Sequence, residues 1–405
     1  MSKHDIVLYG ATSFVGQITA DYLVQQLSTQ PELRLAFAGR NMDKLESLKK
    51  QLGEKANPVT LLHADATDND SIHSMCNATH VVISTVGPYA LYGEPVVKAC
   101  ASLGTDYCDL TGEPQWIHRM LARYESVAKL SGARIVHSCG FDSIPSDLGV
   151  YFLQQQAQQE HQQPCSTIAM RVRRLKGGAS GGTVASMLQL IEEVSRSPAL
   201  RKVIANPYAL CPDGHGFTVR QDNLHSAKYD RRFKSWMAPF VMAAINTRIV
   251  HRSNALLQNA YTDHFRYDEA MLTGHDMSGR MRAYSMTAVL GGIMLAGRFK
   301  LSRDMLANWI LPKPGEGPSP REQENGYYDL RFIGQTDDNH TVSVKVYGDR
   351  DPGYGSTAKM LGQAALCLRF DIADKEGGFW TPASAFGQDL ITRLEQHAGL
   401  QFTVE

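Results

Sequence analysis

The stretch IVLYGATSFVGQITADYL, residues 6–23, decides the fold of this chain. The apolar run at residues 6–9 predicts a buried strand, and the amphipathic pattern from residue 15 to about residue 27 predicts a helix directly after it. Gly10 permits the tight turn between strand and helix, and Gly16 permits the helix to pack closely against the strand. This order indicates a binding site for the pyrophosphate of a dinucleotide, because free N–H groups at the helix N-terminus face the phosphates.

A serine occupies the position at which many of these turns carry their middle glycine. A small side chain fits there if the φ of Ser13 is negative, and its hydroxyl can donate a hydrogen bond to a phosphate oxygen. Thr12 can donate in the same way. Both hydroxyls can instead cap the helix that follows, and the sequence does not separate the two interpretations.

Size and composition indicate a globular protein of two domains without a nucleic-acid partner. The 405 residues exceed the usual size of one domain, and 43% hydrophobic residues are sufficient for a large buried core. Lys plus Arg and Asp plus Glu each total 41, so no excess charge favours binding to nucleic acid. The seven cysteines are scattered without a CxxC pair, which argues against a disulfide framework and against a zinc site. We therefore expect no bound metal.

We expect the protein in the cytoplasm. Dispersed cysteines suit a reducing compartment, and the chain enters its first strand after MSKHD without a signal peptide. The longest apolar segments, residues 236–245 and 284–296, are too short or too interrupted to span a bilayer. The first of them follows Arg231, Arg232 and Lys234, so peripheral contact with the inner face of the membrane is a further interpretation.

Short apolar runs alternate with helical patterns over residues 1–150. This alternation predicts an α/β fold whose first domain is a doubly wound parallel sheet of the Rossmann type that binds NAD(P). Continuous apolar runs such as VVIS are typical of strands that are covered on both faces. The six predicted strands are residues 6–9, 35–38, 59–63, 81–85, 105–109 and 133–138.

The pattern changes after residue 150 and predicts a second, mixed α+β domain over residues 151–354, which would bind the substrate or a second copy of the chain in a homodimer. STIAMRVRRL is strand-like, and a helix is expected at residues 183–193. YYDLRFIGQ and HTVSVKVYGD, on either side of TDDN, predict a β-hairpin. LPKPGEGPSP, residues 311–320, predicts a loop, and residues 198–283 show little pattern.

The end of the second strand selects between the nicotinamide dinucleotides. An acidic residue there binds the ribose 2′-hydroxyl of NAD, whereas an arginine accommodates the 2′-phosphate of NADP. The stretch LAFAGR ends in Arg40, whose guanidinium suits a phosphate, so we expect NADP(H). Asp65, after the third strand, is placed to reach the adenine, and an ordinary turn aspartate explains it equally well.

Three loops follow the fourth, fifth and sixth strands, at the edge where open α/β sheets bind ligands. In STVGPY, Gly87 permits close approach to the nicotinamide, and Tyr89 is a candidate substrate contact or a simple turn aromatic. Asp147 also suits a helix cap, and Cys139, with no visible base partner, is expected to be a wall residue. Four carboxylates in these loops can orient a substrate or relay protons. They are Asp109, Glu113, Asp142 and Asp147.

The chain resembles the saccharopine dehydrogenase-like oxidoreductases in GATSFVG, AGR, STVGPYALYGEPVVKAC, DYCDLTGE and CGFDSIPSDLG. The resemblance extends over most of the chain through GGTVASMLQLIEE, LPKPGEGPS and GGFWTPASAFGQDLITRL. It is greatest to the trans-acting enoyl reductases of mycobacterial lipid biosynthesis and to the animal saccharopine dehydrogenase-like oxidoreductase. It implies that residues 355–405, with helices near residues 356–370 and 383–396, return to the Rossmann domain.

The resemblance also implies a set of cofactor contacts. The nucleotide-binding loop of the family falls on GATSFVG, its 2′-phosphate position on the arginine of AGR, and its nicotinamide-side loops on TVGPY and CGF. Together with the adenine contact expected above, the predicted cofactor-binding residues are Gly10, Thr12, Ser13, Phe14, Val15, Gly16, Arg40, Asp65, Thr85, Gly87 and Cys139.

We expect an NADPH-dependent oxidoreductase that transfers a hydride to an enoyl group or another lipid-like acyl substrate between the domains. Tyr89 and Asp142 are the candidates for proton donation or carbonyl contact. One alternative is a saccharopine-type dehydrogenase of amino acids, which would need cationic side chains for several carboxylates. A second alternative is a nucleotide-binding adaptor at the membrane surface without turnover. The arginines considered for the first alternative are Arg171, Arg173, Arg174 and Arg196.

Overall fold

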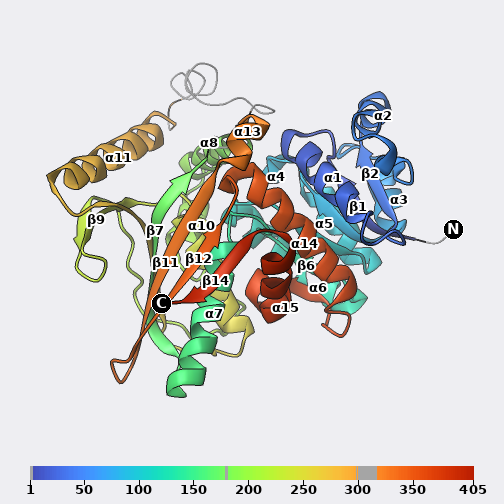
Figure 1. Ribbon diagram of the computed structural model, residues 1–405. Coiled ribbons are helices and arrows are strands. Elements are labelled where there is room, and N and C mark those ends of the chain that lie inside the picture. Colours follow the sequence, from blue (N-terminus) through green and yellow to red (C-terminus); the bar gives the residue numbers. More distant parts are fainter. Residues whose placement is uncertain (1–2, 178–180, 298, 300–316) are drawn as a thin grey trace.

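The computed structural model describes residues 3–177, 181–297, 299 and 317–405, with only the backbone of residues 181–185 (Figure 1). Two seven-stranded sheets organise this part of the chain. Of the predicted loop at residues 311–320, residues 311–316 lie outside the described residues. No helix within the described ranges is both long enough and apolar enough to cross a membrane.

Sheet A is parallel throughout and has the strand order β13-β6-β5-β4-β1-β2-β3. The order reverses between β1 and β4, which is the switch point of a doubly wound sheet. The expected fold class and all six expected strands are confirmed. Their bounds are β1 (His4–Tyr9), β2 (Leu35–Gly39), β3 (Thr60–His63), β4 (Thr79–Ser84), β5 (Asp106–Asp109) and β6 (Arg134–Val136).

The apolar run of β1 is buried on both faces of the sheet. Ile6 and Leu8 pack into one core cluster, and Val7 and Tyr9 pack into the other. The first cluster includes α1 (Phe14–Gln26), α2 (Met42–Gln51) and α14 (Thr357–Phe370). The second cluster includes α3 (Asn69–Asn77), α5 (Glu94–Leu103) and α6 (Pro114–Ser131). Helices on both faces explain why these strands read as continuous apolar runs.

The seventh strand of sheet A comes from the other end of the chain and was not predicted. β13 (Gly378–Trp380) pairs in parallel with β6, and α14 packs against α1, β1, β4 and β5. The C-terminal segment thus supplies one edge strand and one covering helix of the sheet that the N-terminal residues begin (Figure 1). The three residues of β13 are too few to show a strand pattern in the sequence.

Sheet B is mixed, with the order β14-β12-β11-β7-β10-β9-β8. β7 and β10 are parallel, and the other pairs are antiparallel. The predicted hairpin is confirmed as β11 and β12. The buried residues of β12 alternate with partly exposed ones, as expected for a sheet with one covered face. The bounds are β7 (Cys165–Lys176), β8 (Lys228–Asp230), β9 (Ser235–Pro239), β10 (Arg266–Gly274), β11 (Tyr327–Thr336), β12 (Thr341–Gly348) and β14 (Leu400–Val404).

The helices of the second half lie around and between the two sheets. α7 (Ile144–His161) packs against sheet B and against α15 (Pro382–His397). α11 lies at the outer edge of the molecule, against β9 and β10 (Figure 1). The remaining described helices and turns are α4 (Tyr89–Tyr92), α8 (Gly181–Arg196), α9 (Pro198–Ala205), α10 (Ala243–Leu256), α11 (Met277–Ala296), α13 (Pro320–Glu324), η1 (Glu54–Ala56) and η3 (Pro352–Ser356).

Candidate active site

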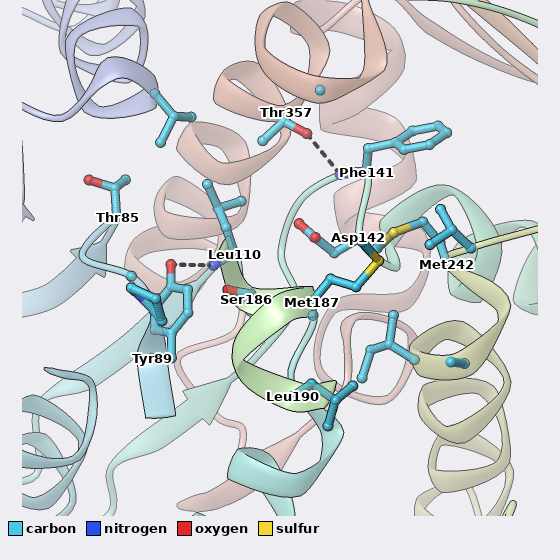
Figure 2. A pocket seen from close by; sticks show the side chains of 18 of the residues that line it. Thr85, Tyr89, Leu110, Phe141, Asp142, Ser186, Met187, Leu190, Met242 and Thr357 are labelled. Atoms are coloured by element: carbon cyan, nitrogen blue, oxygen red, sulfur yellow. Dashed lines mark hydrogen bonds between the residues drawn. The ribbon is translucent and has the colours of Figure 1, made fainter. Parts of the chain in front are cut away.

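A cavity of about 310 Å³ lies at the carboxyl edge of sheet A, beside the ends of the paired strands β1 and β4 (Figure 2). The loops after β1, β4, β5 and β6 form one side of it. α8, the segment that leads into α10, and one residue of α11 form the opposite side. η3 and the first residue of α14 complete the wall. The switch point of an open parallel sheet is the place where such folds bind their ligands.

Two glycines close the turn after β1. Gly10 has a φ of +85°, and a Cβ on this residue would lie 2.7 Å from Val86 Cγ2. Gly16 lies so close to the Gly10 carbonyl oxygen that a Cβ on Gly16 would not fit. The turn therefore holds the N-terminus of α1 against the end of β1, which only residues without a side chain permit.

Ser13 caps α1 in this structure. Its φ is −69°, and its Oγ accepts a hydrogen bond from the Gly16 N–H at 3.0 Å. The same Oγ lies 3.1 Å from Thr85 Oγ1, which donates to the carbonyl of Gly10 at 3.0 Å or of Tyr9 at 3.2 Å. Because the Thr85 proton goes to a carbonyl, the Ser13 proton is directed to Thr85. Both protons are used within the chain, so the geometry favours the capping interpretation of Ser13.

The first turn of α1 presents backbone donors at the cavity. Phe14 and Val15 line the cavity, and their N–H groups have no acceptor in the described part of the chain. The Phe14 ring packs edge-on against Tyr354, with 4.7 Å between the ring centroids. Thr12 is partly buried beside them, and its carbonyl accepts a hydrogen bond from the Gln17 side chain at 3.1 Å. Unpaired N–H groups at a helix N-terminus are the donors that a phosphate requires.

Arg40 and Asp65 are neighbours at the same edge of sheet A. Arg40 follows β2 and is exposed, and the Asn41 side chain caps α2 directly after it. Asp65 follows β3 and accepts hydrogen bonds from the N–H and the hydroxyl of Thr67, each at 2.9 Å. These two hydrogen bonds, and to a smaller extent the charge of Arg40, lower the pKa of Asp65. An exposed guanidinium at the end of β2 is available to a 2′-phosphate.

Tyr89 is a buried part of the cavity wall. Its hydroxyl donates to the Ser84 carbonyl at 2.9 Å and accepts from the Leu110 N–H at 3.1 Å. Burial, with the charge of Asp109 as a second cause, raises the pKa of this hydroxyl far above its usual value. Its proton is therefore both engaged and hard to remove. Proton donation by Tyr89 stays a prediction, and these contacts do not favour it. The Tyr89 ring instead lies beside Gly87, which lines the cavity: a Cβ on Gly87 would be 3.5 Å from Tyr89 Cε2.

Glu113 connects the two sides of the cavity. Its carboxylate accepts hydrogen bonds from the N–H groups of Tyr89 and Ala90, each at 2.9 Å, and so holds the start of α4. It also accepts a hydrogen bond from Ser186 Oγ of α8 at 2.7 Å. Burial raises the pKa of Glu113. This carboxylate thus ties α8 to the loop after β4, a role that the sequence did not indicate.

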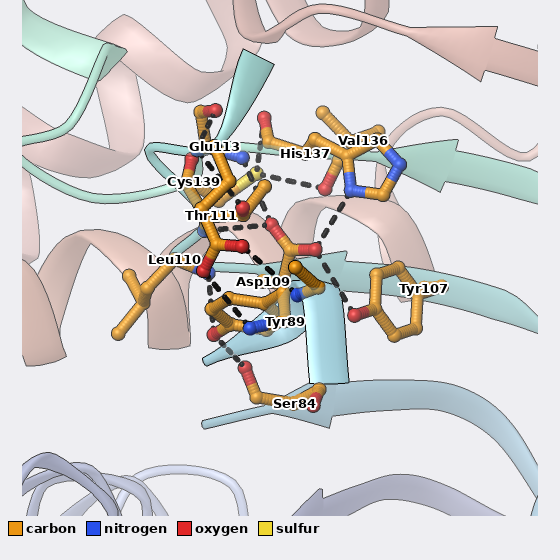
Figure 3. Close-up of polar contacts among 12 residues, drawn as sticks. Ser84, Tyr89, Tyr107, Asp109, Leu110, Thr111, Glu113, Val136, His137 and Cys139 are labelled. Carbon is orange, nitrogen blue, oxygen red and sulfur yellow. Dashed lines mark hydrogen bonds and ion pairs between the residues drawn. The ribbon is translucent and has the colours of Figure 1, made fainter. Parts of the chain in front are cut away.

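Asp109, at the end of β5, is the centre of a buried polar cluster (Figure 3). Its Oδ2 lies 2.7 Å from His137 Nδ1 and 3.0 Å from the Tyr107 hydroxyl. Its Oδ1 accepts from the N–H groups of Thr111 at 3.1 Å and Ser138 at 3.0 Å. These four partners satisfy the carboxylate, which therefore fixes the loops after β5 and β6 relative to each other.

Cys139 follows this cluster and faces the core. Its thiol is fully buried, 3.5 Å from the Val136 carbonyl oxygen, and burial raises its pKa far above the usual value. A buried neutral thiol is inert, as expected of a wall residue. The Cys139 N–H donates to the Asp109 carbonyl at 2.7 Å. Neither its thiol nor its N–H is available to a cofactor in this arrangement.

Asp142 places a carboxyl group in the cavity. The backbone of Gly140 and of Gly112 lies beside it: a Cβ on Gly140 would be 3.0 Å from Asp142 Oδ2, and a Cβ on Gly112 would be 3.5 Å from Oδ1. Figure 2 shows the Asp142 side chain close to Met187 and Met242. Burial, with the charge of Asp109 as a smaller cause, raises the pKa of Asp142 to about 7. The group thus keeps its proton up to near-neutral pH, as a general acid must.

Asp147 lies in the core and not in the cavity. Its carboxylate accepts from Ser253 Oγ at 2.6 Å and from the Ala383 N–H at 2.8 Å, so that it joins α7, α10 and α15. Burial raises its pKa to about 7 as well. Of the four carboxylates that the sequence placed in these loops, Asp142 alone lines the cavity.

The second side of the cavity is apolar. Met187 and Leu190 project from α8, and Met242 and Ile245 come from the segment that enters α10. Sequence reasoning missed all four residues, although the helical pattern at residues 183–193 already placed Met187 and Leu190 three positions apart on one helix. Among the residues that the structure describes, no lysine or arginine lines the cavity.

The arginines considered for a dicarboxylic substrate point elsewhere. Arg171 is buried in sheet B and paired with Asp230 at 2.8 Å and with Asp268 at 2.7 Å. Arg173 lies 3.8 Å from Asp329. None of the four arginines considered for this alternative lines the cavity: Arg171, Arg173, Arg174 and Arg196.

Comparison with known proteins identifies the family. Residues 6–136 match the model of the saccharopine dehydrogenase NADP binding domain. A trans-acting enoyl reductase of Mycobacterium bovis is 37% identical over 97% of this chain and 96% of its own length. The chain belongs to the saccharopine dehydrogenase-like oxidoreductases. A Mycobacterium tuberculosis protein, named provisionally as a trans-acting enoyl reductase, is 41% identical over 97% of this chain and 95% of its own.

A solved structure shares the fold of this saccharopine dehydrogenase-like oxidoreductase. Apo saccharopine dehydrogenase (L-Glu forming) from Saccharomyces cerevisiae superposes with a TM-score of 0.58 at 12% identity, over 99% of this chain and 100% of that one. The chain is thus an NAD(P)-dependent oxidoreductase that binds NADP(H), as expected. The residues present fit this cofactor, since the glycine turn leaves the N–H groups of Phe14 and Val15 to a phosphate and Arg40 is exposed after β2.

Proposed function

We propose that this oxidoreductase reduces the carbon–carbon double bond of an enoyl thioester or a similar lipid-like acyl compound. The observation that carries the proposal is the composition of the cavity. The nucleotide turn lies on one side, apolar side chains of α8 and α10 lie on the other, and Asp142 is the carboxyl group between them. An apolar wall suits an acyl chain, and a single protonated carboxyl group suits a reaction that needs one proton.

The chemistry divides between cofactor and protein. NADPH bound at the glycine turn supplies a hydride for the β carbon, and the α carbon then needs a proton. Asp142 is the residue that we assign to proton delivery, because its carboxyl group lines the cavity and its pKa is about 7. Loss of that proton leaves a carboxylate, which takes up a proton from water before the next turnover. Gly87 and the first turn of α1 hold the cofactor, and Tyr89 orients the Gly87 loop.

The amino-acid alternative is less well supported. A saccharopine-type substrate carries several carboxylates, and these require cationic partners when they are buried. The cavity has no lysine or arginine among its described lining residues, and Arg171 is already paired with two aspartates. The adaptor alternative, without turnover, leaves unexplained why a carboxyl group with a raised pKa faces the cavity.

The test is single-turnover oxidation of NADPH, followed by the absorbance of the nicotinamide, with an enoyl thioester as substrate. We expect oxidation of NADPH with the enoyl thioester. We expect neither oxidation of NADPH with the amine and carbonyl compound that would form a saccharopine-type adduct nor reduction of NADP⁺ with the adduct itself. Oxidation coupled only to the amino-acid substrate would establish the first alternative. NADPH binding without oxidation of any of these substrates would favour the adaptor. Asp142→Asn separates binding from chemistry, since it preserves the shape of the side chain and removes the proton.

A further inference from the structure

The apolar helix α11 is largely exposed. Of its described residues, Gly279 and Ala283 are the buried ones, while Met281 is 66% exposed and Val289 is 64% exposed. From Tyr284 to the end of the helix the sequence contains no charged residue. A helix that is apolar on all sides is stable only in an apolar environment. Contiguous exposed apolar surface of this kind marks a contact with a protein or a membrane.

Cationic and aromatic side chains surround the N-terminal end of α11. The Arg280 guanidinium lies 5.2 Å from the Trp236 ring centroid and 5.8 Å from that of Tyr284. Tyr229 packs edge-on against Trp236, with 5.7 Å between the centroids. Tyr and Trp beside Arg are typical of the boundary between lipid and water. We call the cations of this region the basic rim, and its exposed members are Lys228, Arg231, Arg232, Lys234, Arg280 and Arg282.

The carboxylates near the basic rim are already engaged. Asp230 is buried and pairs with Arg171 at 2.8 Å. Asp268 pairs with Arg171 at 2.7 Å and with Arg232 at 3.6 Å. Asp276 caps α11 by accepting from the Gly279 N–H at 2.8 Å. The exposed charge of this surface is therefore positive, which complements an anionic partner.

The apolar surface of α11 continues into the cavity. Met294 of α11 lines the cavity and is 43% exposed, and Val241 lines it and is 44% exposed. Both side chains are thus exposed at the surface and also line the cavity, and Met294 belongs to α11. The proposed active site therefore adjoins the C-terminal part of the exposed helix.

We propose that α11 and the basic rim dock on an anionic lipid bilayer, and that the acyl substrate enters the cavity from the membrane past Met294. The inference rests on the proposed function for the class of substrate. α11 would lie in the plane of the interface, since no described helix spans a membrane. A second copy of the chain is a poorer occupant, because a two-fold contact through this surface would bring two basic rims together without free carboxylates opposite them.

The experiment is co-sedimentation of the full chain with vesicles, without substrate. Vesicles with anionic phosphatidylglycerol are compared with vesicles of phosphatidylcholine alone. We expect binding to the anionic vesicles that weakens with salt. Met281→Glu with Val289→Glu should lower the partition coefficient at least about tenfold. Arg231→Gln with Arg282→Gln should lower it by about fivefold for each charge.

Matched variants on other faces serve as controls. Leu130→Glu changes an apolar residue that is 90% exposed on α6, and Lys44→Gln removes an exposed charge on α2. Both should bind vesicles like the unchanged chain. Equal binding of all variants, or no binding to anionic vesicles, would overturn the proposal. So would a dimer in light scattering that the Met281→Glu, Val289→Glu variant dissociates.

A second readout separates this proposal from the proposed function. Oxidation of NADPH is measured with a short, water-soluble enoyl thioester and no vesicles. The α11 variants should retain this activity while they lose turnover of a long-chain substrate embedded in vesicles. Vesicle binding without any enoyl reduction would refute the proposed function alone. If the α11 variants reduce both the soluble and the embedded substrate as fast as the unchanged chain does, the docking surface alone is refuted.

Discussion

The two sides of the cavity are built by different kinds of interaction. On the sheet A side, directed hydrogen bonds hold the loops, as in the Ser13 and Thr85 pair and the four contacts of Asp109. On the α8 and α11 side, Met187, Leu190 and Met294 offer only apolar contact. Hydrogen bonds are directional and fix one geometry, whereas apolar contacts tolerate many. The first side suits one invariant ligand, the dinucleotide, and the second suits the proposed acyl substrates, whose chains can differ in length.

Asp142→Asn should have the largest effect, because it removes the carboxyl group that we propose as the proton source. We expect kcat for the enoyl substrate to fall by about 10²- to 10⁴-fold, with the Kd for NADPH unchanged. The matched change Asp109→Asn removes a carboxylate with four partners and should lower Tm instead. A similar fall in kcat in both variants at equal Tm would contradict the assignment of a reacting role to Asp142 and a structural role to Asp109.

The pH dependence of stability sharpens the same distinction. The pKa of Asp142 is about 7 in the folded chain, above the ordinary value of about 4, so the folded state holds this proton more tightly. The stability that this group contributes is complete at low pH and is lost as pH rises through about 7. Asp142→Asn should therefore raise Tm relative to the unchanged chain at about pH 8 and not at about pH 4. Thermal melts at the two pH values check this. The variant should retain a pH dependence of Tm to which Asp147 and Glu269, with pKa values of about 7, contribute.

Gly10→Ala tests the close contact between Gly10 and the loop after β4, on the sheet A side of the cavity. Its Cβ would meet Thr85 Oγ1 at 2.8 Å, and the φ of +85° is already costly for alanine. We expect the Kd for NADPH to rise on the order of 100-fold. Gly132→Ala is the matched control, since its φ is +86° and nothing lies within 4 Å of its Cβ. It should lose stability and keep its NADPH affinity in a fluorescence titration. An equal loss of NADPH affinity in both variants would mean that backbone strain, and not the close contact at Gly10, causes the loss.

Arg40→Gln tests the outer end of the nucleotide site. Loss of an exposed charge-assisted contact should raise the Kd for NADPH about tenfold and leave the Kd for NADH nearly unchanged. Lys44→Gln removes an exposed charge of α2 to which we assign no phosphate contact, and it should change neither value. Calorimetric titration with both dinucleotides gives the comparison. A loss of NADH affinity as large as that of NADPH would assign Arg40 to another part of the cofactor.

Ser186→Ala should have the smallest effect, because it weakens the one described side-chain bond from α8 to Glu113. We expect KM for the acyl substrate to rise about threefold to fivefold with little change in kcat. Ser195→Ala, in the same helix, removes a hydroxyl that donates to the Glu192 carbonyl and should leave KM unchanged. Steady-state kinetics with substrates of two chain lengths measures both variants. A change in kcat alone would mean that Ser186 acts on the chemistry and not on the apolar wall.

The sequence predicts the ordered side better than the apolar one. Five of the six predicted strands of sheet A show as apolar runs because they are buried on both faces, whereas the edge strand β3 is only partly buried. The glycine turn shows because backbone geometry demands glycine at residue 10. The sequence does not separate Asp109 from Asp142, since the difference lies in partners such as His137 that the fold brings together. Nor does it reveal β13 or the wall residues of α8, which depend on segments far apart in the chain.

The position of the last two strands has a consequence for biosynthesis. β13 is an edge strand of sheet A and β14 is an edge strand of sheet B, and both are translated after every other described strand. α14, which covers β1, β4 and β5, is also translated late. The nucleotide-binding half therefore stays without part of its apolar cover while the rest of the chain is made. Both sheets therefore reach their final form only after these late segments have been made, and a chain truncated before β13 leaves β6 and β12 as exposed edges.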